Sequence, residues 1–454
     1  MSRRSFTALG TAAAIASGSA LFGAPAVNSS ATGEKIIGAN DRIRCAFVGV
    51  GTRGTELLEQ FKTCEKTEIA AFSDANSKSM DKAAEKFNPK GTKEKDFRKL
   101  LDPSAKIDAV VIATPDHWHA YQMLESCKAG KDIYVEKPLC NMIGEGKILV
   151  EAARKYKTVV QVGFQHRSAP LYRRMFIENR GLFYRTGNIP LTRSCFCNNM
   201  NPGGIGRAKY ADPPAELDWD LWMGPAYNPY QENVAPFKFR WWSEFSSPIA
   251  SFCVHLFDIV RWAYGERNPI MVSTLSSQNY IWDDRTVPVT AEICFKFPSG
   301  RLFSFSYQDA SGNPMMATDD KFEPLGDIEF RGSIATMYLR EDRILLKKEK
   351  VGMFQSKNAW RRPDETVNLE PELAKLNITK LHIENFLACM RSRDKTYMPV
   401  EEGNLSTLMA QMVNASFITG MNLEWDRYRD RFANHLPANE LLMYEYRAPW
   451  KLEP

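Results

Sequence analysis

The strongest constraint in the sequence is a strand, a glycine-rich turn and a helix in immediate succession near the N-terminus. A short β-rich run, Ile43–Val48, leads into Gly49–Gly54 (GVGTRG), and a helical pattern follows from Thr55 to Thr63. In G-x-G-x-x-G the first glycine allows a tight turn, the second lets the backbone approach a pyrophosphate, and the third lets the helix pack on the strand. The helix N-terminus then offers N–H groups and partial positive charge to phosphates. The pattern predicts a dinucleotide-binding Rossmann unit.

An acidic residue follows the next strand at the distance that such a unit requires. A strand is predicted over Glu68–Ser73, and Asp74 comes about twenty residues after the last glycine. A carboxylate there can accept hydrogen bonds from both ribose hydroxyls of NAD and would repel the 2′-phosphate of NADP. Because Ala75–Ser77 contains no arginine, the sequence favours NAD over NADP. The alternative interpretation of Asp74 is a turn residue at a strand end.

Three more apolar runs follow at the spacing of alternating strands and helices. Strands are predicted over 108–113, 132–135 and 159–162, with helices over 118–128 and 144–155. This alternation predicts a doubly wound parallel sheet, whose ligands bind beyond the carboxyl ends of the strands. The segments at those ends are Thr114–His119, Glu136–Pro138 and Gly163–Arg167.

Length and composition describe a globular chain with room for two domains. The chain has 454 residues, of which 44% are hydrophobic and 25% charged, with a formal net charge of +5. Loss of Arg3 and Arg4 with a leader would subtract two and leave about +3, too little to suggest nucleic acid or an anionic membrane. Of the nine cysteines only Cys195 and Cys197 are close together, without the second pair of a zinc site. Strand or loop thiols are therefore favoured over a metal, and a disulfide stays open.

The first 26 residues have the order of an export signal. Arg3-Arg4 is followed by a small-residue apolar stretch over 8–22 and by a small-x-small cleavage site at 24–26. The stretch is too short to span a membrane. The paired arginines resemble a twin-arginine leader, although Thr7-Ala8 stands where Leu-Lys is common. We expect residues 1–26 to be removed, and a periplasmic or secreted mature chain without membrane insertion. A disordered N-terminal tail is the alternative.

The motifs together resemble those of the glucose–fructose oxidoreductase / inositol dehydrogenase / rhizopine-catabolism (Gfo/Idh/MocA) family over nearly the whole mature chain. The resemblance rests on the glycine turn with Asp74 and on four further segments. These are 113–119 (ATPDHWH), 136–138 (EKP), 161–167 (QVGFQHR) and 254–258 (VHLFD). Residues 217–225 (LDWDLWMGP) and 446–450 (YRAPW) resemble an exported bacterial branch of the family.

The resemblance implies an α/β chain whose Rossmann domain precedes an α/β domain with a large, open, mostly antiparallel sheet. The outer face of that sheet commonly mediates oligomerisation, so we expect a homo-oligomer. Strands are predicted over 271–276, 289–297, 302–307, 327–330 and 336–339, and helices over 379–391 and 404–420, the second packing against the Rossmann domain. The expected parts are 1–26 (signal peptide), 40–165 (Rossmann domain), 166–424 (substrate and oligomerisation domain) and 425–454 (C-terminal tail).

The resemblance also names two catalytic candidates, Lys137 and His255. A lysine in Glu-Lys-Pro stabilises developing alkoxide charge, and it can pass a proton if its pKa is depressed. A cis peptide before Pro138 would aim this lysine. His255 stands at the position of a histidine general base, and Asp258 one turn further on either orients it or pairs with Arg261. The alternatives are a surface lysine at a strand end and a satisfied core histidine.

One residue departs from the family pattern. Family dehydrogenases often carry an aspartate four residues before the histidine, and this chain has Ser251 there. Serine holds no charge. The departure puts a Lys-Asp-His site in question, and Glu244, Asp218 or Asp220 could supply a carboxylate from a loop.

The expected cofactor contacts come from the glycine turn and the strand ends. They are Gly49, Gly51, Thr52, Arg53, Gly54, Asp74, Thr114, Pro115, His117, His119, Glu136, Lys137 and Gln165. The i,i+2 spacing of His117 and His119 does not place two imidazoles on one helix face, so no metal site is expected. Arg240, Trp241 and Trp242 either line a sugar site or, for the tryptophans, pack in the core.

Three functions fit these residues. The first is an NAD(P)-dependent oxidoreductase acting on a sugar or cyclitol hydroxyl, with a tightly bound, recycled cofactor because an exported protein meets no replenished nicotinamide pool. The second is a redox-neutral NAD-dependent glycosidase or lyase that works through a transient keto-sugar. The α-N-acetylgalactosaminidases of the family lack the Glu-Lys-Pro that this chain keeps, so their activity is not transferred to it. The third is a non-catalytic NAD-binding relative.

Overall fold

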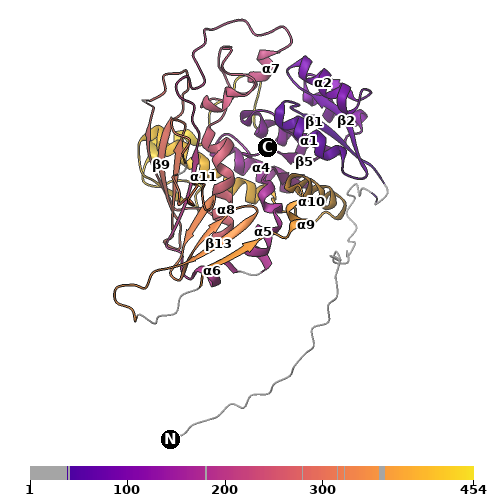
Figure 1. Cartoon of the computed structure of the whole chain (residues 1–454). Helices are drawn as coiled ribbons and strands as arrows, with labels where there is room; N and C mark the ends of the chain where they lie inside the picture. Colours follow the sequence, from indigo (N-terminus) through magenta and orange to yellow (C-terminus); the bar gives the residue numbers. More distant parts are fainter. Residues whose placement is uncertain are drawn as a thin grey trace, which may run out of the picture. The chain divides into compact units, whose positions relative to one another are not determined.

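The computed structural model describes residue 38 and residues 41–178, 181–278, 280–313, 315–321, 323–356 and 363–453 (Figure 1). The predicted leader, residues 1–26, lies outside the described residues. All elements below belong to the unit formed by residues 37–454.

The N-terminal half forms the predicted doubly wound sheet. Its six parallel strands lie in the order β3-β2-β1-β4-β5-β6. In chain order they are β1 Ile43–Val48, β2 Thr67–Ser73, β3 Thr92–Glu94, β4 Ala109–Ile112, β5 Asp132–Val135 and β6 Val160–Val162. The strands β2 and β3 are added on one side of β1, and β4, β5 and β6 on the other. Open α/β sheets bind ligands in the crevice at this point, between β1 and β4. The predicted Rossmann fold is confirmed.

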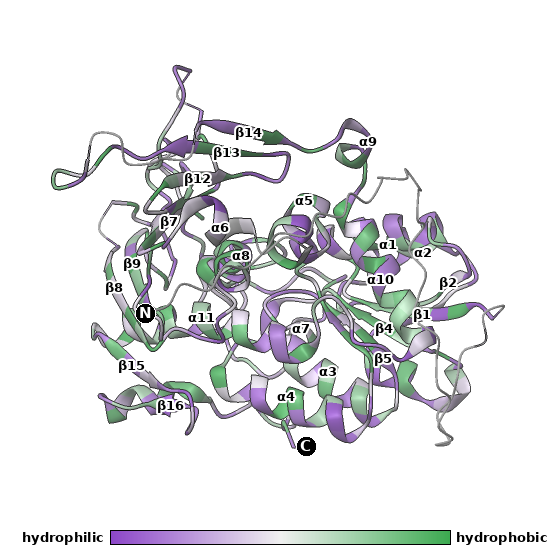
Figure 2. Cartoon of the chain, turned by 90° about the horizontal axis from the view of Figure 1, so that it is seen from below, coloured by the Kyte–Doolittle hydropathy of each residue, from purple (hydrophilic) through white to green (hydrophobic). Residues whose placement is uncertain are grey.

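Helices cover both faces of this sheet, as a buried parallel sheet requires. One face carries α1 (Thr52–Lys62), α2 (Ser77–Phe87) and α10 (Ile378–Ser392), and the other carries α3 (His119–Lys128) and α4 (Ile143–Lys155). α10 comes from far along the sequence and lies beside α1 in Figure 1. Its apolar residues, among them Phe386, join the cluster of Phe47 and Phe61. The helices place hydrophobic residues on one side and hydrophilic residues on the other (Figure 2).

The C-terminal half forms a ten-stranded sheet in which β7 and β10 pair in parallel and the other described neighbours pair antiparallel. Its order is β14-β13-β12-β11-β7-β10-β9-β8-β15-β16. The strands are β7 Leu191–Cys197, β8 Met271–Ser277, β9 Thr290–Lys296, β10 Leu302–Gln308, β11 Ile328–Arg331, β12 Ala335–Leu339, β13 Arg343–Lys348, β14 Glu365–Asn368, β15 Leu423–Asp426 and β16 Arg431–Phe432. The predicted mostly antiparallel sheet is confirmed.

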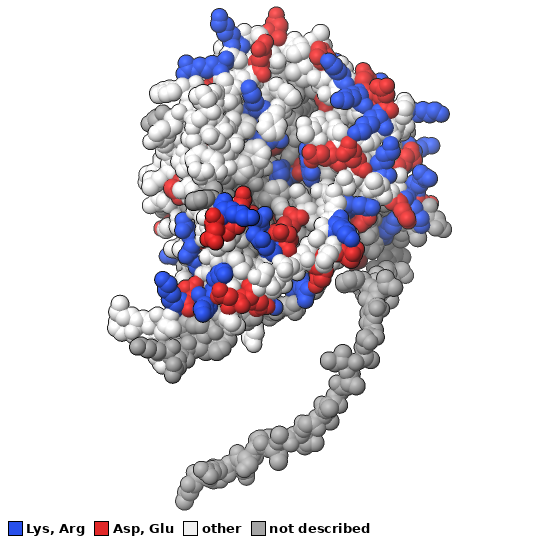
Figure 3. All heavy atoms as spheres, viewed as in Figure 1, with Lys and Arg blue, Asp and Glu red and all other residues white. Residues whose placement is uncertain are grey.

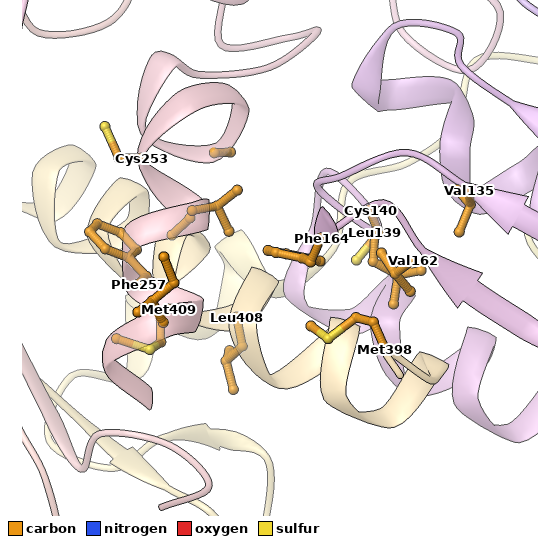
Figure 4. Packing of buried hydrophobic residues seen from close by; sticks show 14 of the residues in the cluster. Val135, Leu139, Cys140, Val162, Phe164, Cys253, Phe257, Met398, Leu408 and Met409 are labelled. Carbon is orange, nitrogen blue, oxygen red and sulfur yellow. The ribbon is translucent and has the colours of Figure 1, made fainter. Parts of the chain in front are cut away.

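Two helices join the halves into one core. α8 (Val254–Tyr264) packs Phe257 against the aromatic side chains of β9 and β10. α11 (Val400–Thr419) is apolar on most sides and buried between α4, α8 and β8, as expected of a helix without a polar face. Figure 4 shows Met398, Leu408 and Met409 between side chains of the Rossmann half and those of α8. The prediction that this helix packs against the Rossmann domain is confirmed.

The segment predicted as a tail contributes to both halves. β15 and β16 extend the large sheet, although no strand is predicted there. Farther on, Trp450 is buried with its ring centroid 4.8 Å from Trp118 and 5.2 Å from Tyr121. The remaining helices are short: α5 Pro170–Arg173, α6 Gly181–Thr186, α7 Trp219–Met223 and α9 Pro371–Ala374.

Three findings bear on ligands and membranes. All nine cysteines are free. Among the described residues, no group of three or more His, Cys, Asp or Glu side chains is placed to hold a metal ion. In the same part of the chain, each helix is too short or too polar to cross a bilayer.

Candidate active site

A cleft runs along the carboxyl ends of the Rossmann strands. One wall consists of the glycine turn, the end of β2 and the segments after β4 and β5, and the opposite wall comes from residues 214–240. In Figure 3 the face of the molecule is hollowed between these walls, and charged side chains are visible inside the hollow. The cleft lies where a doubly wound sheet binds its ligand.

The three glycines of the turn have separate roles. Gly49 has φ +84°, and a Cβ there would lie 2.6 Å from the Thr114 nitrogen. A Cβ on Gly54 would lie 2.0 Å from the Gly49 carbonyl oxygen, so α1 packs against the turn only without a side chain. A Cβ on Gly51 would meet nothing within 4 Å and would point into open space. Space is therefore kept free above the middle glycine.

Asp74 follows β2 directly, and backbone N–H groups donate hydrogen bonds to both of its carboxylate oxygens. The N–H of Val50 donates to Oδ2 and the N–H of Asn76 to Oδ1, each at 2.8 Å. Burial raises the pKa of Asp74, and these two hydrogen bonds oppose the increase. The carboxylate is thus fixed beside the glycine turn, where the ribose hydroxyls of a dinucleotide lie.

Arg53 and Glu136 connect the start of α1 with the end of β5. Arg53 Nε donates to Glu136 Oε1 at 2.8 Å, whereas the buried Nη2 has no hydrogen-bond partner. The carboxyl of Glu136 lies against Gly163, where a Cβ would come within 2.8 Å of it. The free space at Gly51 and the placement of Asp74 both fit a bound dinucleotide. N–H groups of the first turn of α1, which has no side-chain cap, would hold its phosphates.

Lys137 projects from the end of β5 toward the C-terminal half. Its Nζ donates to the backbone oxygen of Ser251 at 2.7 Å, and the Lys137–Pro138 peptide is cis, as expected from the sequence. Burial lowers the pKa of Lys137, while the carboxylates of Glu136 and Asp116 oppose this change. The ammonium can therefore lose its proton more readily than an exposed lysine, and it sits in the wall of the cleft.

A carboxylate does stand beside Lys137, but it is not one of the three considered from the sequence. Asp116 Oδ2 accepts hydrogen bonds from the hydroxyls of Ser246 and of Ser251, the latter at 2.8 Å. Asp218 instead caps α7 through Leu221 N, and Asp220 pairs with Arg447. Glu244 is not among the residues that line the cleft.

His255 lies in the first turn of α8 and is not among the residues that line the cleft. Its ring centroid is 5.1 Å from that of His166 and 5.7 Å from that of Phe164, and its Nδ1 has no partner. Burial, followed by the charges of His166 and Lys137, holds the pKa of His255 well below its usual value. The imidazole is therefore neutral near pH 7.

Asp258 does not orient His255. Its carboxylate receives a two-pronged hydrogen bond from Arg167 at 2.8 and 2.7 Å, and Arg261 Nη2 lies 3.7 Å away. The alternative interpretation, an ion pair with Arg261, is therefore the correct one, with Arg167 as the closer partner.

The other predicted site residues divide between the cleft and its surroundings. Gly49, Gly51, Thr52, Arg53, Asp74, Thr114, Pro115, His119, Glu136 and Lys137 line the cleft. His119 bridges two backbone oxygens, that of Pro138 at 2.7 Å and that of Thr114 at 2.9 Å. Gly54 is buried under the turn, and Gln165 lies outside the cleft wall with a buried, unpartnered Oε1.

His117 is turned away from the cleft, which differs from the expectation that it contacts the cofactor. The ring is fully buried, and its Nε2 lies 3.1 Å from the backbone oxygen of Trp222. Burial lowers its pKa to about 3. Trp241 and Trp242 pack in the core, as the alternative for them held, while Arg240 lines the cleft.

Residues 198–247 are here called the covering segment, and their middle part, from Pro214 to Arg240, provides the second wall. Its backbone is tied to the end of β2, since Ser77 N donates to Glu216 O at 2.9 Å and Asp218 N donates to Ala75 O at 3.0 Å. At the other end, the indole N–H of Trp118 donates to Trp222 O at 2.8 Å. The covering segment therefore bridges both ends of the cleft.

Residues 43–164 match the model of the Gfo/Idh/MocA oxidoreductase family with its NAD-binding Rossmann fold. These residues therefore form an NAD-binding Rossmann domain similar to that of the family. The match covers the glycine turn, Asp74, Asp116 and Lys137 of the NAD-binding domain, and it ends before the covering segment and His255.

Curated relatives are similar to this chain over the same part. A glycosyl hydrolase family 109 protein of a Shewanella species is 34% identical over 136 residues, 27% of this chain and 29% of that protein. The α-N-acetylgalactosaminidase of Shewanella oneidensis is 32% identical over 121 residues, 25% of this chain and 26% of that protein. The match thus spans less than a third of the relatives' length.

Solved structures share the fold of both halves. A levoglucosan dehydrogenase in complex with NADH and levoglucosan has a TM-score of 0.63 and 17% identity, covering 85% of this chain and 99% of that one. An aldose–aldose oxidoreductase of Caulobacter crescentus has a TM-score of 0.60 and 14% identity over 84% of this chain and 99% of that one. At these identities the similarity shows the fold, a parallel Rossmann sheet followed by a larger, mostly antiparallel sheet.

Proposed function

We propose that this protein is an NAD-dependent oxidoreductase that acts on a hydroxyl of a sugar or cyclitol. The observation that carries the proposal is the position of Lys137. Its side chain stands in the wall of one continuous cleft with the glycine turn and Asp74, and it reaches across to Ser251 of the C-terminal half. A small carbohydrate bound in that cleft would present its hydroxyl to Lys137 beside the cofactor.

Lys137 and His255 would have separate roles in the reaction. Bound NAD supplies a hydride acceptor for the carbon that carries the hydroxyl. Lys137, with its lowered pKa, takes or returns the hydroxyl proton and stabilises negative charge on the oxygen. His255 is neutral near pH 7 and is a second proton acceptor on the side of the C-terminal domain.

We also propose that the cofactor is retained between turnovers. The covering segment is tied to the Rossmann half at both ends of the cleft, and Arg447 near the C-terminus holds it by donating to Asp220 Oδ1 at 2.6 Å and to Gly224 O at 3.0 Å. A cofactor beneath this segment must wait for several hydrogen bonds to open before it can leave. A mass spectrum of the denatured, freshly purified protein would show co-released NAD, whereas its absence would contradict retention.

Activity is tested by incubating the purified protein with a panel of sugars and cyclitols while absorbance of reduced nicotinamide is followed. We expect reduction of the cofactor with at least one compound. His255→Ala should lower kcat by about 100-fold and leave NAD binding unchanged in calorimetry, as for loss of a general base. If the native protein neither retains nor binds a nicotinamide nucleotide, the proposal is wrong.

A second candidate is a redox-neutral glycosidase or lyase that passes through a transient keto-sugar. The similarity of the NAD-binding domain to glycosyl hydrolase family 109 proteins favours it, and a retained cofactor would serve it well. Aryl glycosides distinguish the candidates, because release of the aglycone without net reduction of the cofactor supports the second. A protein that retains NAD but neither reduces it nor releases product would be a non-catalytic relative.

Two properties rest on the sequence resemblance. We propose that the protein is exported by a twin-arginine-type leader, which Arg3-Arg4→Lys-Lys should block, with N-terminal sequencing of the exported form showing a start after residue 26. We also propose a homo-oligomer through the outer face of the large sheet. Light scattering that finds a monomer would contradict the latter.

A further inference from the structure

Ser251 stands where family dehydrogenases often carry an aspartate, and a carboxylate from the Rossmann half lies beside it. Ser251 contacts Lys137 through its backbone oxygen at 2.7 Å. The hydroxyl of the same residue donates to Asp116 Oδ2 at 2.8 Å. Ser251 thus stands between an ammonium and a carboxylate, and brings both to one point of the cleft.

Asp116 is built into this position. It follows β4 at the start of a 3-10 turn, is 5% exposed and lines the cleft. Ser246, whose hydroxyl also donates to Oδ2, lies 2.9 Å from the Ser251 hydroxyl, and both serines are buried. Two hydroxyl groups thus donate to the same oxygen of Asp116 and fix the position of its carboxyl group.

The other charged groups around Lys137 do not provide this carboxylate. Glu136 is engaged by Arg53 Nε at 2.8 Å. The guanidinium of Arg240 is a cation, lies over the rings of Phe237 and Phe239, and donates to the backbone oxygen of Phe237. Glu136 and Asp116 both raise the pKa of Lys137, and of the two Asp116 is the carboxylate that no arginine engages through a hydrogen bond.

We propose that Asp116 is a positioning residue that supplies, from the Rossmann domain, the carboxylate that this chain lacks at position 251. This proposal rests on the oxidoreductase function proposed above. When Lys137 takes the proton of the substrate hydroxyl, its ammonium forms beside the carboxylate, which stabilises the charge in a site with little water. Ser246 and Ser251 hold the carboxylate in place.

The first test is Asp116→Asn, which keeps the shape of the side chain and removes its charge. With the sugar that the wild-type enzyme oxidises, kcat should fall about 100-fold, with little change in KM or in NAD binding. The acid limb of the pH profile of kcat/KM should move to lower pH, because loss of the carboxylate lowers the pKa of Lys137. Asp81→Asn is the matched control: its carboxylate pairs with Lys93, is 61% exposed and lies outside the cleft wall, so its loss should leave activity unchanged.

The second test restores a carboxylate near Lys137 from position 251 of the C-terminal half. Asp116→Asn combined with Ser251→Asp places a carboxylate where the Ser251 hydroxyl now meets Asp116, and should recover at least tenfold of the lost kcat. Wild-type kcat and an unmoved acid limb in Asp116→Asn would overturn the proposal. The proposal would also be overturned if Asp116→Asn lost activity, Ser251→Asp did not recover it, and the acid limb of the pH profile stayed at its wild-type position.

A third measurement does not depend on any substrate. Reductive methylation with ¹³C labels Lys137, and the NMR titration of its signal reports its pKa directly, with assignment by Lys137→Arg. The pKa should be lower in Asp116→Asn than in the wild type and unchanged in Asp81→Asn. Equal pKa values would refute the role of Asp116 even for a protein that oxidises no sugar in the panel, whereas a difference together with inactivity would refute only the oxidoreductase function.

Discussion

The middle glycine of the turn offers a sharp test of whether a dinucleotide lies in the cleft. Gly51 has φ −66° and ψ −156°, an extended conformation that alanine adopts without strain, and an added Cβ would meet no protein atom within 4 Å. Gly51→Ala should gain about 0.5 kcal/mol from a less flexible unfolded chain and lose about as much because alanine is a poorer N-cap than glycine. The free energy of unfolding should thus change by less than about 1 kcal/mol.

The same methyl group should nevertheless impair cofactor binding. It occupies the space through which the backbone approaches the pyrophosphate, so at least one hydrogen bond between an N–H group and a charged phosphate is lost or stretched. Such bonds contribute about 1.5–3 kcal/mol each, and displacement of the phosphate also costs contact area. We expect a loss of about 3 kcal/mol, which is more than 100-fold in Kd.

The assay combines thermal melting with calorimetric titration of NAD into protein freed of its cofactor. Gly203→Ala is the matched control, because Gly203 is the other described glycine that has neither a positive φ nor an atom within 4 Å of an added Cβ, and it lies outside the cleft wall. Its melting temperature and NAD affinity should both stay at the wild-type values. Unchanged NAD affinity in Gly51→Ala would show that no pyrophosphate passes over this residue, and the reasoning about the cleft would be refuted.

Two further predictions concern stability. Asp258→Asn removes the carboxylate that receives both hydrogen bonds of the buried Arg167, whose other partner Glu402 is 3.7 Å away, and should cost about 3 kcal/mol in chemical denaturation at pH 7. Burial alone would raise the pKa of Asp258, but Arg167 holds this pKa below its usual value. The carboxylate therefore stabilises the fold fully above the unfolded pKa of about 3.9. This stabilisation is lost as the pH falls through the lower pKa of the folded protein. An equal stability difference between the variant and the wild type at all pH values would contradict this assignment. Trp450→Ala removes a buried ring from its contact with Trp118 and should cost about 3–4 kcal/mol, which a melting temperature equal to that of the wild type would exclude.

Local patterns were sufficient to predict the Rossmann half because its signals lie close together in the chain. Gly49 occupies a positive φ that other residues avoid, and buried parallel strands leave uninterrupted apolar runs such as Ala109–Ile112. The predicted start of the first helix, Thr55, is three residues late, since its first turn, Thr52–Gly54, faces the cleft and carries no apolar periodicity.

The C-terminal sheet was predicted only in part. β7 (Leu191–Cys197) has no predicted counterpart, because arginine, serine and cysteine interrupt its alternation, yet it is a central strand between β10 and β11. β15 and β16 are short edge strands that exist through pairing with β8 and with each other. A strand of this kind is defined by its neighbours more than by its own residues.

The candidate site shows the same division between local and tertiary information. Sequence alone determined the glycine turn, Asp74 and the position of Lys137 after a strand, since each depends on residues next to it in the chain. Only the tertiary structure decided that Asp116 is the carboxylate beside Lys137, because its serine partners lie 130 and 135 residues further along the chain. The tertiary structure also decided that His117 is buried against Trp222 and that α10 packs on one face of the Rossmann sheet. Hydrogen bonds and burial between segments so far apart follow from how the two halves pack, and no local pattern of residues carries that information.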